Sequence, residues 1–193
     1  MLPYRLTGYA IISDDDCIAD ADGNMPTVLM NEADWRYFQA GLDRAALVLI
    51  GRHGHEAHPN PPHRRRLVLT STVEGFVRDP AEQGVGEVYR VNPAVVPLAE
   101  ALARLVRPGA EVAVPGGRLV FDACLELGFD AFHLARKRGA RLKNGVKIFT
   151  TCQIGTRPET VLADHGLAPA ETIALDPVAR VDLVVHRRLV AGG

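Results

Sequence analysis

The chain has 193 residues, 47% of them hydrophobic and 23% charged, and its formal net charge is -1 at pH 7. The 22 basic residues are balanced by 23 acidic ones, which argues against a nucleic-acid partner. This length predicts one globular domain, residues 1–193, that can bury a full core without disulfides.

Cysteine usage and hydropathy indicate where such a protein resides. The three cysteines are odd in number and far apart, with no Cys-x-x-Cys pair, which argues against a disulfide framework or a cysteine zinc site. No apolar run approaches the length of a membrane span, and the first residues lack the hydrophobic region of a signal peptide. We therefore expect a cytoplasmic protein with no membrane partner, either monomeric or a homo-oligomer.

Short apolar runs predict the strands of a buried sheet in the first half of the chain. Residues 8–13 form the first run, and residues 45–50, 67–70 and 88–91 form the next three. The second and third runs do not alternate cleanly between polar and apolar residues, which is typical of strands covered on both faces. Residues 20–26 predict a loop of the kind that often closes over a site, and residues 75–86 predict a surface loop.

Helices and strands alternate in the second half. We expect a helix over residues 96–106, where leucines keep helical spacing, and a strand at 111–114 that leads through a glycine pair into an apolar helix ending near 127. Strands follow at 131–135 and 146–149, and residues 171–175 and 181–186 form a closing antiparallel pair. This order predicts an α/β protein with a mixed, mostly parallel central sheet and an antiparallel C-terminal edge.

Asp34 is the first candidate for an active-site acid. On the short helix expected here, Asp34 and Phe38 are four residues apart and so lie on one face, and Trp35 and Tyr37 add aromatic surface. A carboxylate beside aromatic rings, on a face leading into a buried strand, is a candidate pocket acid. The alternative is that Asn31 or Asp34 simply caps the helix.

Polar side chains follow two neighbouring strands. Arg52 and His53 stand at the carboxyl end of one strand, where ligands gather in open α/β sheets. The arginine, with the hydroxyls of Thr70, Ser71 and Thr72 after the next strand, would suit a 2′-phosphate. The alternative is a solvated basic turn.

A glycine pair, Gly116-Gly117, joins a strand to a helix. Bare backbone N–H groups and the positive end of a helix dipole suit a pyrophosphate at such a turn. Two glycines are not a full dinucleotide-binding fingerprint, and a tight turn that needs glycine dihedrals is the alternative.

His53, His55 and His58 are close to the H-x-H-x-D-H run of metallo-β-lactamase-like hydrolases, and histidines at such spacing can bind zinc. Ala57 stands where that family has its metal-binding Asp, so two-metal chemistry lacks a ligand. We expect no metal, and a metallohydrolase is a remote alternative.

Five motifs in chain order together resemble the dihydrofolate reductase family. The match covers most of the chain, although the closing half matches only in outline. They are a loop ending in Met-Pro, an Ala-Asp-x-x-x-Phe helix start, a strand followed by Gly-Arg-His, a proline-rich turn with an arginine before a strand ending in Ser/Thr, and a Gly-Gly turn. They stand here as Met25-Pro26, Ala33 to Phe38, Gly51-Arg52-His53, Arg64 with Thr70-Ser71, and Gly116-Gly117.

The resemblance implies a three-layer αβα fold and NADPH-dependent reduction of a 7,8-dihydropterin, with dihydrofolate as the expected substrate. It places the catalytic carboxylate on Asp34 and the clamp for the substrate's α-carboxylate on Arg64. The further substrate-binding residues are Leu29, Trp35 and Phe38, and the cofactor-binding residues are Arg52, His53, Thr70, Ser71, Gly116, Gly117, Arg118 and Phe121, the last as a ring-stacking aromatic.

Departures from the family pattern keep other functions open. Leu29 replaces the tryptophan of the mobile loop, Gly54 replaces a threonine, and Ala135 or Arg136 replaces the threonine that hydrogen-bonds the acid. A dihydromethanopterin reductase would use the same chemistry, and a non-catalytic pterin- or nucleotide-binding homologue would have lost it. The reductase domain of riboflavin biosynthesis shares the fold but lacks the Ala-Asp helix.

Overall fold

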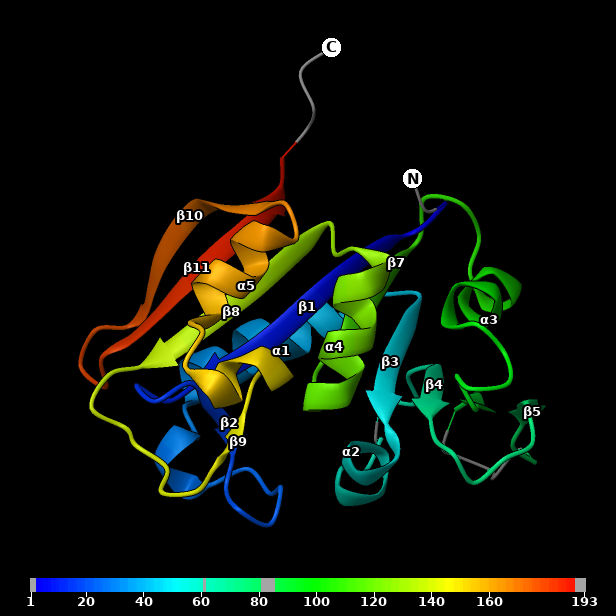
Figure 1. Ribbon diagram of the computed structural model, residues 1–193, viewed down its shortest axis with the longest axis horizontal. Helices are drawn as coiled ribbons and strands as arrows, with labels where there is room; N and C mark the ends of the chain where they lie inside the picture. Colours follow the sequence, from blue (N-terminus) through cyan, green and yellow to red (C-terminus); the bar gives the residue numbers. More distant parts are fainter. Residues whose placement is uncertain (1–2, 61, 81–85, 190–193) are drawn as a thin grey trace.

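A nine-stranded mixed sheet forms the centre of the computed structural model, which describes residues 3–60, 62–80 and 86–189 (Figure 1). The strand order is β10-β11-β8-β1-β7-β3-β4-β6-β5. The parallel strands are β1 (Arg5–Ile12), β3 (Leu47–Gly51), β4 (Arg66–Leu69), β6 (Val88–Val91), β7 (Glu111–Val114) and β8 (Ala131–Lys137). The antiparallel strands are β5 (Phe76–Arg78) at one edge and β10 (Leu167–Asp176) with β11 (Val181–Arg188) at the other. The predicted sheet with an antiparallel C-terminal edge is confirmed.

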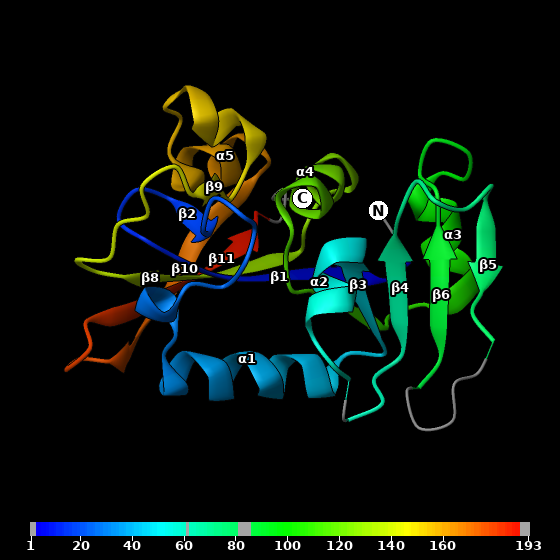
Figure 2. The same cartoon turned by 90° about the horizontal axis from the view of Figure 1, so that it is seen from below.

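Helices cover both faces of this sheet. Figure 2 shows α1 (Glu32–Arg44) on one face and α4 (Arg118–Leu127) and α5 (Pro158–Asp164) on the other. Helix α3 (Leu98–Leu105) packs into the same core cluster as α4 and α5. Alternation along β1 supplies both layers of core: Leu6 and Ile12 join the larger cluster with α3, α4 and α5, whereas Tyr9 lies under α1. The three-layer αβα arrangement expected from the sequence is confirmed.

Gly41 allows α1 to lie close to the sheet. A Cβ atom at this position would stand 2.6 Å from the ring of Tyr9, nearer than real Cβ contacts allow. The small residue therefore lets the helix pack directly on the tyrosine that lies at the base of the site described below.

Small elements gather beyond the carboxyl ends of the parallel strands. α2 (Arg52–Ala57) follows β3, and β2 (Cys17–Ala19) pairs with β9 (Val146–Lys147) in a separate two-stranded sheet. Two 3-10 helices, η1 (Thr27–Leu29) and η2 (Thr150–Ile154), complete this region. None of the helices within the described ranges is both long and apolar enough to cross a membrane.

Several elements differ from the prediction. Arg52 and His53, for which a solvated basic turn was the alternative interpretation, begin helix α2, and the expected loop 75–86 contains β5, although its residues 81–85 lie outside the described residues. The strand expected over 146–149 pairs over only two residues, and with β2 instead of the central sheet. These elements are two to six residues long, too short for hydrophobic periodicity to reveal them. Packing against other segments of the chain, and not the local sequence pattern, determines their structure.

Candidate active site

A pocket lies between α1 and the sheet, near the carboxyl ends of the strands. It encloses about 450 Å³ of space, counting the part open to solvent. Its walls come from β1, the loop after β2, α1, the turn after β7, β8 and β11, and its lining residues are Tyr9, Ala10, Ile11, Met25, Asp34, Trp35, Tyr37, Phe38, Pro115, His133 and Leu183. Three of the predicted site residues, Asp34, Trp35 and Phe38, therefore line one pocket.

Asn31, and not Asp34, caps helix α1. The Asn31 side chain accepts a hydrogen bond of 3.0 Å from the backbone N–H of Asp34. In the part of the chain that the structure describes, no side chain or backbone group donates to the Asp34 carboxylate, and burial raises the pKa of this carboxyl to about 6. Since the helix cap needs nothing from Asp34, its carboxylate is available to accept hydrogen bonds from a ligand.

Aromatic rings flank this carboxylate. Phe38 lies 5.6 Å from Trp35, centroid to centroid, and 6.2 Å edge-on from Tyr9. Trp35 is 56% exposed although it lines the pocket, so it stands at the mouth and Tyr9 at the base. Aromatic walls around a single carboxylate suit a flat heterocycle that carries hydrogen-bond donors on one edge.

A tyrosine–histidine pair forms the other polar feature of the pocket. The Tyr37 hydroxyl lies 2.7 Å from Nδ1 of His133, and the imidazole stacks on Tyr9 at 4.7 Å. Burial, with help from Arg187 and Arg44, lowers the pKa of His133 to about 4. The sequence analysis missed His133, and it noted Tyr37 only as aromatic surface beside Asp34. The only available signal was alternation in β8, which puts His133 on the same face as Ala135.

The same alternation resolves an ambiguity in the sequence. Ala135 packs with Ile11 and Leu183 on the α1 side, and Arg136 points to the opposite face. Ala135 therefore occupies the position nearer the pocket, where it offers no hydroxyl to Asp34.

A second group of predicted residues lies along the carboxyl ends of β3, β4 and β7. Val48 pairs with Ala113 and Gly51 with Leu69, so the residues that follow these strands reach the same edge of the sheet. There Gly116 and Gly117 turn into α4 with φ values of 126° and 88°, which only glycine adopts without strain. The edge carries the predicted residues Arg52, His53, Thr70, Ser71, Gly116, Gly117 and Arg118.

Arg118 and Arg52 differ in how their charges are satisfied. The Nε of Arg118, in the first turn of α4, is buried and has no hydrogen-bond partner within the described residues. Arg52 is exposed at the start of α2 and pairs with Glu56 at 3.1 Å, which is a weak surface contact. An anion at the glycine turn would satisfy the buried Nε of Arg118 and meet the helix N-terminus. This edge therefore fits the phosphates of a dinucleotide.

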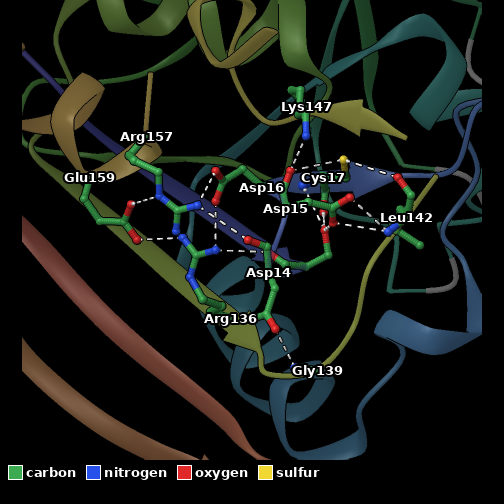
Figure 3. A network of polar contacts seen from close by, with 11 residues as sticks. Asp14, Asp15, Asp16, Cys17, Arg136, Gly139, Leu142, Lys147, Arg157 and Glu159 are labelled. Atoms are coloured by element: carbon green, nitrogen blue, oxygen red, sulfur yellow. Dashed lines mark hydrogen bonds and ion pairs between the residues drawn. The ribbon is translucent and has the colours of Figure 1, made fainter. Parts of the chain in front are cut away.

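A polar network holds the segment between the first strand and the pocket loop (Figure 3). Buried Arg136 donates to Asp16 at 2.8 Å, to the backbone carbonyl of Ser13 at 3.0 Å and to Glu159 at 2.7 Å. Arg157 adds a second ion pair to Asp16 at 2.8 Å. Residues 13–17 are thereby fixed against β8 and α5, and the loop that delivers Met25 to the pocket continues from this anchored segment.

Two predicted site residues are buried away from the pocket. Leu29 is fully buried in a cluster with Cys17, Ala140 and Leu142, because η1 turns its side chain inward. Phe121 is also fully buried, within 6.5 Å of three other phenylalanine rings of the core. Neither of these fully buried side chains offers surface to a ligand in this structure, and the roles of Leu29 as a substrate contact and of Phe121 as a ring-stacking aromatic stay predictions.

Arg64 occupies a place that the sequence analysis did not foresee. Its guanidinium pairs with Asp43 at 2.6 Å and donates to the side-chain oxygen of Gln39 at 2.7 Å, and its side chain is only 13% exposed. Arg64 does not line the pocket, but Gln39 directly follows the pocket residue Phe38 on α1. The predicted carboxylate clamp thus already holds a carboxylate from its own chain. Pro61, in the turn before Arg64, lies outside the described residues.

The histidine run does not form a metal cradle among the described residues, where no group of three potential ligands gathers. His55 Nδ1 instead lies 3.1 Å from Nη1 of Arg66, which also donates to the backbone carbonyl of His58. A buried guanidinium at this point is unfavourable for a metal cation.

No protein-family model matches this sequence, and no curated protein matches it. Solved structures do. A dihydrofolate reductase from Enterococcus faecalis, complexed with NADP(H), is similar at 17% identity and a TM-score of 0.63, over 95% of this chain and 96% of that chain. The chain has the dihydrofolate reductase fold.

Other proteins share this dihydrofolate reductase fold. A diaminohydroxyphosphoribosylaminopyrimidine deaminase/5-amino-6-(5-phosphoribosylamino)uracil reductase from Thermotoga maritima is 16% identical, with a TM-score of 0.63. The match covers 96% of this chain and 56% of that longer protein. A putative riboflavin biosynthesis protein from Shewanella sp. PV-4 is 16% identical, with a TM-score of 0.60 over 96% of this chain and 99% of that chain.

Proposed function

We propose that this protein reduces a 7,8-dihydropterin to the tetrahydro form with NADPH, by hydride transfer to C6 and protonation of N5. The observation that carries the proposal is Asp34: a partly buried carboxylate with no donor partner among the described residues, at the side of an aromatic pocket. A pterin presents N3–H and its 2-amino group side by side, and one carboxylate can accept both hydrogen bonds.

The raised pKa of Asp34 supports acid–base chemistry in this pocket. Burial raises this pKa to about 6, so the carboxyl exchanges protons near neutral pH. Asp34 would hold the donor edge of the ring and favour the protonated form of the substrate at N5. Phe38 and Trp35 would flank the ring and exclude water from it.

The edge beyond β3, β4 and β7 is where we place NADPH, which supplies the hydride when bound. Gly116, Gly117 and Arg118 would hold the pyrophosphate, because they offer a positive-φ turn, a helix N-terminus and a guanidinium nitrogen that has no partner among the described residues. Arg52 and His53, with Thr70 and Ser71 after β4, would hold the 2′-phosphate.

Reduction of an aminopyrimidine ribotide is the second candidate. Two of the similar solved structures carry names from riboflavin biosynthesis, and Arg64 is engaged by Asp43 instead of standing free for the glutamate of a folate. The N3–H of a uracil ring lies between two carbonyl oxygens, so a ribotide would have to present N1–H and its exocyclic 6-amino N–H to Asp34 instead.

NADPH oxidation followed at 340 nm, a property of the cofactor, tests the proposal. Purified protein is mixed with NADPH and one of three substrates: dihydrofolate, a dihydropterin without the aryl-glutamate tail, or an aminouracil ribotide. We expect turnover with a dihydropterin, and we expect Asp34→Asn to lower it by roughly two to four orders of magnitude at neutral pH. Turnover with the ribotide alone would favour the second candidate, and unchanged turnover in Asp34→Asn would remove Asp34 from the mechanism.

A further inference from the structure

The contact between Tyr37 and His133 fixes more than the shape of the pocket. Both residues line the pocket, the hydroxyl of Tyr37 lies 2.7 Å from Nδ1 of His133, and the imidazole is stacked at 4.7 Å on Tyr9 with 21° between the planes. The hydrogen bond and the stacking together restrict the imidazole to one orientation.

The ionisation of the pair limits which nitrogen can carry the proton. Burial raises the pKa of the Tyr37 hydroxyl, so the phenol keeps its proton, and burial lowers the pKa of His133, so the imidazole is neutral at pH 7 and carries one proton. In one of its two tautomers Nδ1 accepts the hydrogen bond from the Tyr37 O–H, and this is the tautomer that the inference below requires. A neutral imidazole that accepts at Nδ1 carries its own proton on Nε2.

The Nε2–H of His133 is then a donor without an acceptor among the described residues, on a side chain that lines the pocket. Asp34 and Tyr37 are three residues apart on α1 and so lie on one face of the helix, which sets the carboxylate one turn from the tyrosine–histidine pair. The pocket therefore offers a hydrogen-bond acceptor, Asp34, and a fixed donor, His133, to the same ligand.

We infer that His133 donates a hydrogen bond to the ring carbonyl oxygen of a 2-amino-4-oxo heterocycle whose N–H and amino edge is held by Asp34. The His133 contact favours a 4-oxo ring over a 2,4-diamino ring that lies in the same orientation. An amino group in place of the carbonyl oxygen would direct a donor at a donor, leaving Nε2–H without a partner. This inference rests on the proposed function, because it requires the ring to lie in the pocket against Asp34.

Equilibrium binding of two ligands that differ at one position tests this selectivity. The dissociation constants of 2-amino-4-oxopteridine and 2,4-diaminopteridine are measured by their own fluorescence, for wild type and three variants. His133→Phe keeps an aromatic ring on Tyr9 and removes both nitrogens, Tyr37→Phe removes only the hydroxyl, and His133→Gln restores a side-chain donor. We expect His133→Phe to reduce the preference for the oxo ligand about ten-fold, Tyr37→Phe to reduce it less, and His133→Gln to recover part of it.

Two results would overturn the inference. One is a ratio of dissociation constants that is the same in wild type and His133→Phe. The other is a tautomer with the proton on Nδ1 in the free protein, which nitrogen-15 NMR of His133 reads without any ligand. If neither pteridine binds, or if Asp34→Asn leaves the binding of both unchanged, the proposed function itself is overturned, and the inference with it.

Discussion

Asn31 and Asp34 were equal candidates for the cap of α1, and the difference between them determines what the site can do. Either residue type stabilises a helix start, so the sequence could not choose between them. The structure gives the cap to Asn31, which accepts the backbone N–H of Asp34 at 3.0 Å and leaves the Asp34 carboxylate without a donor from the described residues. Asp34 could thus be predicted as a pocket acid from its aromatic neighbours, whereas its unpaired state could not.

Asp34→Asn should make the protein more stable above about pH 4, with the full effect above about pH 6. Burial raises the pKa of the folded-state carboxyl to about 6 from its usual value of 3.8. Below the unfolded-state pKa both states hold the proton and the mutation changes little. As the pH rises from the unfolded-state pKa to the folded-state pKa, the unfolded chain of the wild type ionises while the folded one resists, and the cost grows to its full size, on the order of 1–2 kcal/mol after allowance for partial exposure.

Urea unfolding of both proteins at pH 4 and pH 7.5 measures this difference. Glu126→Gln, which removes a negative charge from the exposed side of α4, is the matched control and should show no such dependence. A stability difference between wild type and Asp34→Asn that is equal at both pH values would mean that the Asp34 carboxyl ionises normally.

At the scale of elements, α2 and α4 both begin at the edge beyond β3, β4 and β7, where we propose that NADPH binds, and only the start of α4 was predictable. The Gly116-Gly117 pair predicts the start of α4, because two glycines before an apolar run indicate a turn at positive φ that leads into a helix. The six residues of α2 contain three polar histidine or arginine side chains and no apolar period, so packing beside β3 and β4 determines that helix. A short polar helix of this kind carries little signal in sequence.

Arg52 and Arg118 should affect cofactor binding differently. Arg52→Ala should weaken NADPH by about ten-fold or more while leaving NADH nearly unchanged, because only NADPH carries the 2′-phosphate that we assign to Arg52. Arg118→Ala should weaken both cofactors by similar factors, because both carry the pyrophosphate placed at α4. Quenching of tryptophan fluorescence by each cofactor, in the wild type and both variants, gives the six dissociation constants. Equal losses of NADPH and NADH affinity in Arg52→Ala would show that Arg52 does not contact the 2′-phosphate.

The far end of α1 should control the response to a folate tail. Nine residues of helix separate Asp34 from Asp43, about 13 Å along the axis, so a substrate held at Asp34 could reach Arg64 with an extended tail. Asp43 already occupies that arginine, at 2.6 Å, and its side chain is 60% exposed. An incoming carboxylate must therefore displace a carboxylate of the chain.

Asp43→Asn should release Arg64 and lower the Michaelis constant for dihydrofolate several-fold, since a charge-assisted pair contributes on the order of 1.5–3 kcal/mol. The constant for a dihydropterin without a tail should stay the same. The double variant Asp43→Asn/Arg64→Ala should lose the gain. A higher Michaelis constant for dihydrofolate in Asp43→Asn would mean that Asp43 positions Arg64 for the substrate instead of competing with it.

For the whole molecule, the positions of the strands along the chain were easier to predict from the sequence than the order in which they pair. Apolar runs located most of the central strands and the closing antiparallel pair, because burial on both faces leaves a compositional record. The pairing of β2 with β9, some 130 residues apart in the chain, leaves no such record in the sequence. Buried Arg136 was noted only as a substitution, and the network it forms with Asp16, Glu159 and Arg157 required the fold to be known (Figure 3).

That network predicts a large loss of stability from a residue far from any ligand. The side chains of Arg136 and Asp16 are 6% and 10% exposed, and Arg136→Met would leave the Asp16 carboxylate with Arg157, whose side chain is 51% exposed. Removing one partner of a buried ion pair leaves the other charge poorly compensated, so we expect the free energy of unfolding to fall by about 3 kcal/mol.

Arg36→Ala, which breaks an exposed pair with Glu32 on α1, is the control and should change stability by less than about 1 kcal/mol. The double variant Arg136→Met/Asp16→Asn should recover part of the loss, because it removes a buried carboxylate that would keep only the exposed Arg157 as its partner. Urea unfolding of the wild type, Arg136→Met, Asp16→Asn and the double variant measures this cycle. A double variant no more stable than Arg136→Met alone would show that Arg136 stabilises the fold by packing under α5, and not by neutralising the segment that leads to the pocket loop.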